Sequence, residues 1–375
     1  MRPAKPRPRS RRTSAIVLSA VLAVAALGAA ACNDDSSPKA AGGHGPLGQQ
    51  THLRVGIPKG ELGPLPIYTG VDKGYFKDQG VEVTVDDSYA SYQDALKALG
   101  DGKVDLVYDD YVHALLAQAS GNFRLQLVAE GYTAGDGGVQ LLSRPTDAAS
   151  EAKIRAVFAA HDGFLVPLSG TGDPKTDYTV PTVMLMTRLP DVANSMKLKN
   201  YGDDVPDTVL DAAQNHLKPV AVGAIGEKLT GSDNVNLAGV EPEPYYSYTV
   251  GTDKTTKLMD LTRGSTQAMP MGGYFAKQDF AVADANQNLL KAFTAGLNQA
   301  KTVTSQRATA MAEMQAHYGS LATSTAVANI SFGTFPTTVS VDRVKRVLTL
   351  MQNLGLAPYL NIDTMMPPDA LRGQG

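Results

Sequence analysis

The sequence predicts an α/β protein of two lobes, each a mostly parallel sheet flanked by helices. Between residues 53 and 129, short apolar segments rich in β-branched residues alternate with helix-like segments, as in βαβ units. The same alternation starts again after Arg144, and the C-terminal part is helical in pattern. A chain of 375 residues with a formal net charge of −3 is long enough for two lobes.

The N-terminal segment predicts export from the cell. A basic start, MRPAKPRPRSRRTSA, is followed by an apolar run over residues 15–31, as in a secretory signal peptide. The run ends at Cys32, the only cysteine of the chain, so no disulfide forms within it. Residues 1–32 resemble a bacterial lipoprotein signal, which implies cleavage before Cys32 and lipidation of this residue. Such signals usually have Leu three residues before the cysteine, where this chain has Ala29, so ordinary Ala-x-Ala cleavage stays open. An uncleaved transmembrane helix is a third reading, but the run is slightly short of the ~20 residues that a bilayer requires.

Residues 33–50 contain Gly, Pro, Ser and Ala with little to bury, which predicts a flexible tether. We therefore expect the folded part to begin near residue 51, outside the cell and anchored to the outer face of its membrane. Beyond the N-terminus, Lys and Arg are interspersed with Asp and Glu. This pattern excludes a nucleic-acid partner, which would need a basic stripe.

The first elements form a repeated strand and helix pattern. LRVGI (53–57) predicts a strand, and Gly63-Pro64 opens a helix that should end near Gly74. Gly80 permits the turn into a β-branched strand at 81–85. Ser91 is expected to cap the next helix, with Asp94 reaching back to the cap. The following elements are a strand at 104–108, a helix at 110–118 and a strand at 123–129.

Ligands of open α/β sheets bind outside the carboxyl ends of the strands. The loops 58–63, 86–91 and 108–111 follow such ends and are therefore the expected site. Further along, we expect helix then strand within 152–167, helices at 182–189 and 208–216, strands at 235–240 and 272–276, and helices at 288–303, 307–317 and 341–354.

Four segments in order resemble a known family: LRVGI (53–57), VDKGYFKDQGVEV (71–83), DALKALGDGKVDLVY (94–108) and EPEPYYSY (241–248). They are similar to extracytoplasmic substrate-binding proteins of ABC importers, of the nitrate/sulfonate/taurine and thiamine-pyrimidine type. The resemblance implies a type II periplasmic-binding-protein-like fold with two crossovers, near residues 135–140 and 264–271, and a ligand in the cleft between the lobes. Lobe 1 would comprise residues 51–137 and 267–375, and lobe 2 residues 138–266. The chain departs from the family in a longer, more charged stretch at 168–182, and over 218–234 it lacks the family's usual Asp-Ala segment.

The candidate ligand-binding residues fall into three chemical groups. Hydroxyls near helix N-termini would suit a sulfonate or carboxylate oxygen, although Ser91 is equally explained as a helix cap. Carboxylates would instead suit an amine or aminopyrimidine, although acids at a helix start also act as caps. Tyrosines could stack on a planar ligand. The candidates are Gly60, Glu61, Leu62, Ser88, Ser91, Tyr108, Asp109, Asp110, Tyr132, Thr171, Glu241 and Tyr245.

No enzyme signature is present in the sequence. The part after Cys32 has no cysteine, nucleophile elbow, Walker loop or His-Glu metal helix, and the histidines are scattered. We therefore expect a binding protein without cofactor or metal. The predicted function is capture of a small solute of the sulfonate, nitrate or taurine class by a lipoprotein that delivers it to the permease subunits of an ABC importer. A pyrimidine-like or amine-bearing ligand is the alternative, as is a sensor or interaction domain without an importer. We expect a monomer.

Overall fold

A first sheet has five strands in the order β2-β1-β3-β10-β4. β1 pairs in parallel with β2 and β3, whereas β10 pairs antiparallel with β3 and β4. This sheet and the helices on it are called lobe 1. Its strands are β1 (His52–Pro58), β2 (Glu82–Tyr89), β3 (Leu106–Asp110), β4 (Leu125–Thr133) and β10 (Pro270–Lys277).

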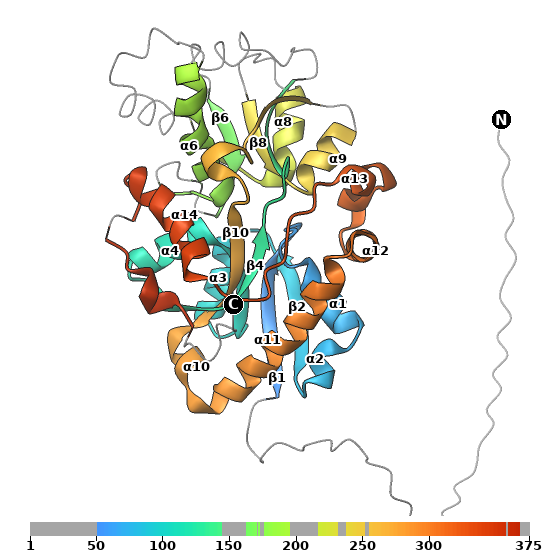
Figure 1. Cartoon of the computed structure of the whole chain (residues 1–375), viewed down its shortest axis with the longest axis vertical. Coiled ribbons are helices and arrows are strands. Elements are labelled where there is room, and N and C mark those ends of the chain that lie inside the picture. The colour runs from blue at the N-terminus through green and yellow to red at the C-terminus, as the bar shows by residue number, and fades with distance from the viewer. Residues whose placement is uncertain are drawn as a thin grey trace, which may run out of the picture. The chain divides into compact units, whose positions relative to one another are not determined.

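A second sheet has five strands in the order β7-β6-β8-β5-β9. β6 pairs in parallel with β7 and β8, and β5 pairs antiparallel with β8 and β9. This sheet and its helices are called lobe 2, and Figure 1 shows β6 and β8 grouped with α6, α8 and α9. Its strands are β5 (Val139–Ser143), β6 (Phe164–Pro167), β7 (Leu217–Val220), β8 (Ala238–Pro242) and β9 (Thr256–Asp260).

The prediction of two α/β lobes with two crossovers is confirmed, but the sheets are mixed rather than mostly parallel. The chain passes from lobe 1 to lobe 2 at residues 134–138 and returns at residues 261–269. The strand entered after each crossing, β5 or β10, runs antiparallel to both of its neighbours. Half of the strand pairs in each sheet are therefore antiparallel, because each crossover feeds a reversed strand into the sheet interior.

The helices follow the predicted positions closely in lobe 1. The helix expected at 307–317 has these bounds, and those expected at 288–303 and 341–354 are confirmed with small shifts at their ends. The lobe 1 and C-terminal helices are α1 (Leu65–Asp72), α2 (Tyr75–Asp78), α3 (Tyr92–Gly100), α4 (Tyr111–Ala119), α10 (Gln278–Val282), α11 (Asp284–Thr304), α12 (Arg307–His317), α13 (Ser324–Asn329) and α14 (Val341–Asn353). The lobe 2 helices are α6 (Val180–Ser195), α8 (Ile225–Gly231) and α9 (Tyr245–Gly251), and the 3-10 turns are η1 (Val222–Ala224), η2 (Gly264–Thr266), η3 (Gly319–Ala322) and η4 (Ile362–Met365).

This computed structural model describes residues 51–144, 163–170, 172, 176–195, 217–231, 238–251, 255–357 and 359–367. They belong to one compact unit, residues 45–375. The expected signal peptide with Cys32, the tether, the helix before β6, Thr171 and the helix at 208–216 lie outside these residues. Among the described helices, none is long and apolar enough to cross a membrane.

Two glycines close the corner between α1 and β2. Gly74 has φ 76° and Gly80 has φ 79°, a left-handed conformation in which other residues are strained. Between them lies the short helix α2, and its Phe76 stacks on Phe293 of α11 with ring centroids 5.4 Å apart. The corner therefore anchors the long C-terminal helix on lobe 1.

Ser91 caps α3 as predicted, accepting a hydrogen bond from the Asp94 amide at 3.1 Å. The expected return bond differs, because the Asp94 carboxylate accepts from the Ser91 hydroxyl at 2.8 Å and not from its backbone. The aspartate side chain is one carbon shorter than the glutamate usual at this position.

Buried charges fix the C-terminal helices on the sheet. The Arg343 guanidinium of α14 donates to the Glu130 carboxylate of β4 at 2.9 Å, and this carboxylate also accepts from the Ser340 amide at 2.5 Å. Lys301 of α11 donates to the backbone carbonyls of Glu130 and Pro336, and burial lowers its pKa to about 7. These bonds hold α11 and α14 against β4, next to the crossover into lobe 2.

Candidate ligand-binding site

A small cavity lies between the two lobes, at the carboxyl ends of β1, β3, β6 and β8. Its volume is about 30 Å³, which has room for roughly one or two water molecules. A larger solute would fit only if the two lobes moved apart, as domains do in a hinge motion. Its lining comes from lobe 1 and the first crossover (Glu61, Leu62, Gly63, Tyr92, Tyr108, Asp110, Tyr132, Ala134, Gly138, Met271) and from lobe 2 (Val139, Pro167, Thr179, Pro181, Val222, Pro242, Glu243).

Asp110 joins the lobes across this cavity. Its Oδ1 accepts from the backbone amides of Val112 at 2.8 Å and His113 at 3.2 Å, so it caps α4. The same carboxylate accepts from the amide of Val180, the first residue of α6 in lobe 2, at 2.9–3.0 Å. Burial and the nearby negative charges raise the pKa of Asp110 well above its usual value. This aspartate thus occupies the N-termini of two helices at once.

Asp109 is not part of the cavity lining, and its carboxylate bonds His113. Nδ1 of His113 lies 2.8 Å from Oδ1 of Asp109, and Nε2 lies 3.2 Å from Oε1 of Gln93. Burial raises the pKa of Asp109, and the neighbouring imidazole opposes this rise. His113 is therefore a packed histidine outside the cavity lining.

Glu61 lies in the loop after β1 and reaches the cavity. Burial raises the pKa of its carboxyl to about 7, against a hydrogen bond from the Tyr92 hydroxyl that lowers it. The Tyr318 hydroxyl donates to the Glu61 carbonyl at 2.6 Å, and the Tyr245 hydroxyl of lobe 2 donates to the Lys59 carbonyl at 3.2 Å. The loop is therefore fixed from the C-terminal segment and from lobe 2.

Glu243, from lobe 2, is the third carboxyl that lines the cavity. It accepts from the Ser247 hydroxyl at 2.8 Å and amide at 3.1 Å, and from the Ser331 amide at 2.9 Å. Burial raises its pKa to about 7. Glu241 lies behind it, 1% exposed, and its Oε2 bonds no described residue. Burial raises the pKa of Glu241 to about 7 as well.

Two tyrosines shape the lobe 1 wall. The Tyr132 hydroxyl accepts from the Gly333 amide at 2.8 Å, so its ring is fixed by the C-terminal segment. Tyr108 is 2% exposed and packs against Gly63, where an added Cβ would lie 1.8 Å from the tyrosine oxygen. Only glycine fits there, because the loop backbone passes directly over the ring.

The turn after β6 encloses a carboxylate of its own chain. The amides of Ser169, Gly170 and Gly172 donate to Asp177, which is fully buried. The sequence made this turn a candidate for binding an anionic oxygen through its hydroxyls. In the structure its amides already bind Asp177.

The structure gathers some of the predicted residues and separates others. Glu61, Leu62, Tyr108, Asp110 and Tyr132 line the cavity, whereas Thr171 lies outside the described residues. The others stand apart from the lining: Gly60 and Tyr245 line a neighbouring pocket, Ser91, Asp109 and Glu241 are buried, and Ser88 is exposed and bonds Asp86.

Sequence reasoning missed Tyr92, Thr179, Met271 and Glu243 among the lining residues. Tyr92 belongs to the buried face of α3, and its hydroxyl also bonds Glu61. The repeated Glu-Pro of EPEP could have indicated Glu243, since it follows the end of β8. Thr179 and Met271 had no local signal.

Comparison with known proteins supports the fold. Residues 64–143 match the family model described as NMT1/THI5 like, and no curated protein matches the sequence. The ligand-binding component of an ABC-type import system from Staphylococcus aureus, in a structure with zinc bound, superimposes with a TM-score of 0.63 at 12% identity, over 86% of this chain and 98% of that chain.

Two further solved structures are similar. The periplasmic aliphatic sulphonate binding protein SsuA from Escherichia coli has a TM-score of 0.58 at 15% identity, over 87% of this chain and 94% of that chain. The periplasmic nitrate-binding protein NrtA from Synechocystis PCC 6803 has a TM-score of 0.55 at 12% identity, over 85% and 91%. At these identities the likeness establishes the fold. The predicted resemblance is therefore confirmed: the chain has the type II periplasmic-binding-protein fold, and its segment 64–143 matches the NMT1/THI5-like family model.

Proposed function

We propose that the protein is the solute-binding component of an ABC importer and that its cleft binds a small solute bearing an amine or an aminopyrimidine-like donor face. The proposal rests on the charge of the cavity. Glu61, Asp110 and Glu243 line it, and the described lining contains no Lys, Arg or His. Carboxylates bind ammonium and amidine-like groups through charge-assisted hydrogen bonds, whereas they repel an anion.

Several of the backbone amides that could bind an anion are also occupied. Helix N-termini attract sulfonate and carboxylate oxygens because their first amides have no partner within the helix. Here the amides of α4 and α6 bind Asp110, and the amide of Ser247 in α9 binds Glu243. The chain's own acids thus take three of the helix N-termini that an oxyanion ligand could use, although that of α1 has no side-chain cap, and this favours a ligand of the opposite charge.

Burial of these carboxyls makes a pH test possible. The pKa of Glu61 and that of Glu243 are raised to about 7 by burial. A cationic solute binds the ionised form, so its affinity should increase as pH rises through 7. An anionic solute would show the opposite trend, because it binds best when the carboxyls are protonated.

A sulfonate, nitrate or taurine ligand is the second candidate. Its support is the fold likeness to proteins whose names state sulphonate and nitrate binding. With such a ligand the acids would act only as helix caps and structural groups. Thermal unfolding against amines, aminopyrimidines, alkanesulfonates, taurine and nitrate separates the candidates, because a ligand of the folded state raises the melting temperature.

The variants Glu61→Gln and Glu243→Gln make the test specific to the cavity. Each should weaken an amine ligand by about 1.5–3 kcal/mol, as expected for a hydrogen bond to a charged group. Glu82→Gln is the matched control, since this glutamate is exposed on β2, outside the cavity lining. Stabilisation by sulfonates alone, unchanged in both cavity variants, would contradict the amine proposal.

The proposal also includes the location and the partners of the protein. We infer a lipid anchor at Cys32 on the outer face of the membrane, permease subunits as partners, a monomeric state and no catalytic activity. Fractionation tests the anchor: Cys32→Ala should release the protein from membranes, and a parent protein that is already soluble would contradict lipidation. Neighbouring genes for a permease and an ATPase would support an importer over a sensor domain without one.

A further inference from the structure

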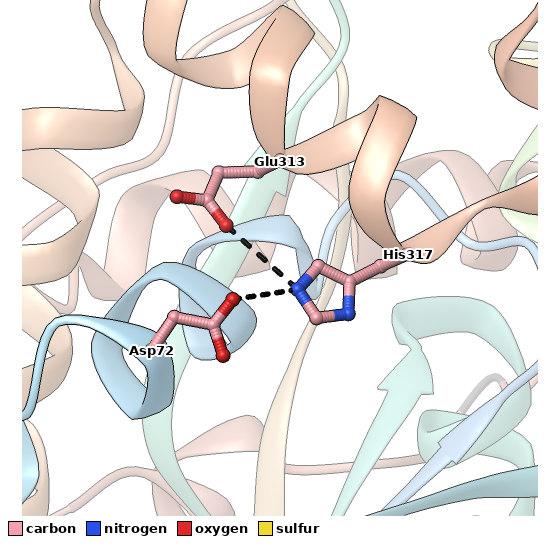
Figure 2. A group of neighbouring side chains, drawn as sticks. All are labelled: Asp72, Glu313 and His317. Carbon is pink, nitrogen blue, oxygen red and sulfur yellow. Dashed lines mark hydrogen bonds and ion pairs between the residues drawn. The ribbon is translucent and has the colours of Figure 1, made fainter.

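Three side chains with metal-binding atoms converge outside the cavity. Glu313 and His317 are one helical turn apart on α12, so they lie on the same face, and Asp72 ends α1 opposite them (Figure 2). Nε2 of His317 lies 2.8 Å from Oδ2 of Asp72 and 3.8 Å from Oε2 of Glu313. Their nearest ligand atoms all lie within 4.8 Å of one another. We refer to these residues as the α1–α12 cluster.

The cluster includes a carboxylate that makes no hydrogen bond to the described residues. The Glu313 side chain is 9% exposed, and its only polar partner among the described residues is the imidazole at 3.8 Å. Burial and the charge of Asp72 raise the pKa of Glu313, against the nearby charges of Lys73 and His317. Figure 2 shows the Glu313 carboxylate directed towards the same ring nitrogen as Asp72.

We propose that the α1–α12 cluster binds a divalent transition metal ion such as zinc through Nε2 of His317 and one oxygen each from Asp72 and Glu313. A mixed imidazole and carboxylate set suits zinc and its neighbours, whereas calcium and magnesium prefer oxygen ligands alone. Zinc bonds of 2.0–2.2 Å in a tetrahedron place donor atoms about 3.3–3.5 Å apart. The separations of 2.8 and 3.8 Å bracket this value and no separation exceeds 4.8 Å, so side-chain shifts of roughly an ångström would complete the site.

The histidine is held in a suitable orientation. Its ring stacks on Tyr68 with centroids 4.5 Å apart and an interplanar angle of 19°. The Tyr68 hydroxyl donates to Asp87 at 3.1 Å, which fixes the ring on which His317 rests. Groups that orient a metal ligand in this way strengthen metal binding. The fourth position of the metal would be open to water.

A metal here would act beside the cleft rather than in it. The ion would join the C-terminal end of α1 to that of α12, and the next residue, Tyr318, donates to the carbonyl of Glu61. A metal would therefore fix the C-terminal end of α12, and through Tyr318 this helix end holds the loop that contains Glu61. This inference is independent of the proposed function, since it requires no solute in the cavity.

Calorimetric titration of the chelator-treated protein, purified without an affinity tag and with no solute present, tests the site with zinc alone. We expect one zinc ion per chain. Glu313→Gln and His317→Gln should each weaken zinc binding by at least about tenfold. His52→Gln is the control, because this histidine bonds Thr84 of β2, outside the cluster, and its replacement should leave zinc binding unchanged.

Further measurements separate loss of the site from loss of the fold. Circular dichroism should show that the variants are folded, and Asp72→Asn changes only an exposed side chain yet should also weaken zinc binding. Cobalt in place of zinc should give the visible absorption of a nitrogen and oxygen site, and this absorption should disappear in His317→Gln. Zinc binding that survives both the Glu313 and His317 substitutions, or no measurable binding at millimolar zinc, would overturn the proposal.

Discussion

Replacing Asp110 with alanine should destabilise the protein by about 3 kcal/mol. The side chain accepts hydrogen bonds from the amides of Val112 and His113, and the loss of such a helix cap costs about 1 kcal/mol. It also accepts from the buried amide of Val180 in lobe 2 at 2.9–3.0 Å. A hydrogen bond to a charged or strongly polar group contributes about 2 kcal/mol, and its loss leaves that amide without an acceptor.

Urea unfolding followed by circular dichroism measures this difference, and two further variants give the scale. Thr323→Ala removes the cap of α13, where the hydroxyl accepts only from the Ala326 amide at 3.2 Å, so it should cost about 1 kcal/mol. Asp110→Asn keeps Oδ1, the atom that accepts from all three amides, and should cost less than half as much as Asp110→Ala. If Asp110→Ala costs no more than Thr323→Ala, the bond to Val180 does not stabilise the lobes, and the reasoning fails.

Three other substitutions test separate parts of the structure. Arg343→Met should cost about 3 kcal/mol in urea unfolding, because it leaves the Glu130 carboxylate, 1% exposed, without its cation. The folded pKa of Glu243 is about 7, above the unfolded value of about 4.3, so this group's contribution to stability should fall as pH rises between them. Glu243→Gln should flatten the pH dependence of the urea midpoint in that range, and an unchanged slope would contradict the raised pKa. Gly63→Ala should abolish solute binding measured by calorimetry, since its Cβ would lie 1.8 Å from the Tyr108 oxygen; retained affinity would show that the loop can move away.

Helices and strands with a clear hydrophobic periodicity, or with clear turn residues at their ends, were predictable from the sequence. The helix α12 has the bounds expected from its pattern, and the corner at Gly74 and Gly80 follows from two residues that tolerate positive φ. The strand β5 was missed, although its five-residue run VQLLS lies between Gly137-Gly138 and Pro145, and both its length and these flanking residues favour a strand over a helix. Its antiparallel pairing with β8 depends on residues about a hundred positions away, which local propensity does not report.

For the site, two of the three loops expected from the sequence line the cavity, 58–63 and 108–111, whereas 86–91 does not, and the roles of their residues were not predictable. Asp110 was expected either to cap a helix or to bind a ligand, and the structure shows that it caps α4 and also lines the cavity. The further hydrogen bond that Asp110 accepts comes from the amide of Val180, which is 70 residues away in the other lobe. The α1–α12 cluster was missed for the same reason, since Asp72 and His317 are 245 residues apart and no spacing rule connects them.

The proposed preference for a cationic solute depends on which groups occupy the helix N-termini at the cleft. Such termini attract oxyanions only while their amides remain without acceptors. In this chain Asp110 occupies two of them, Glu243 a third, and Asp177 the amides of the turn after β6. The backbone architecture is unchanged, but the acceptor is supplied by the protein instead of by the solute. A few acidic residues at strand ends would therefore reverse the charge preference of the cleft without altering the fold. Specificity should change when those residues are substituted, and not when the helices are.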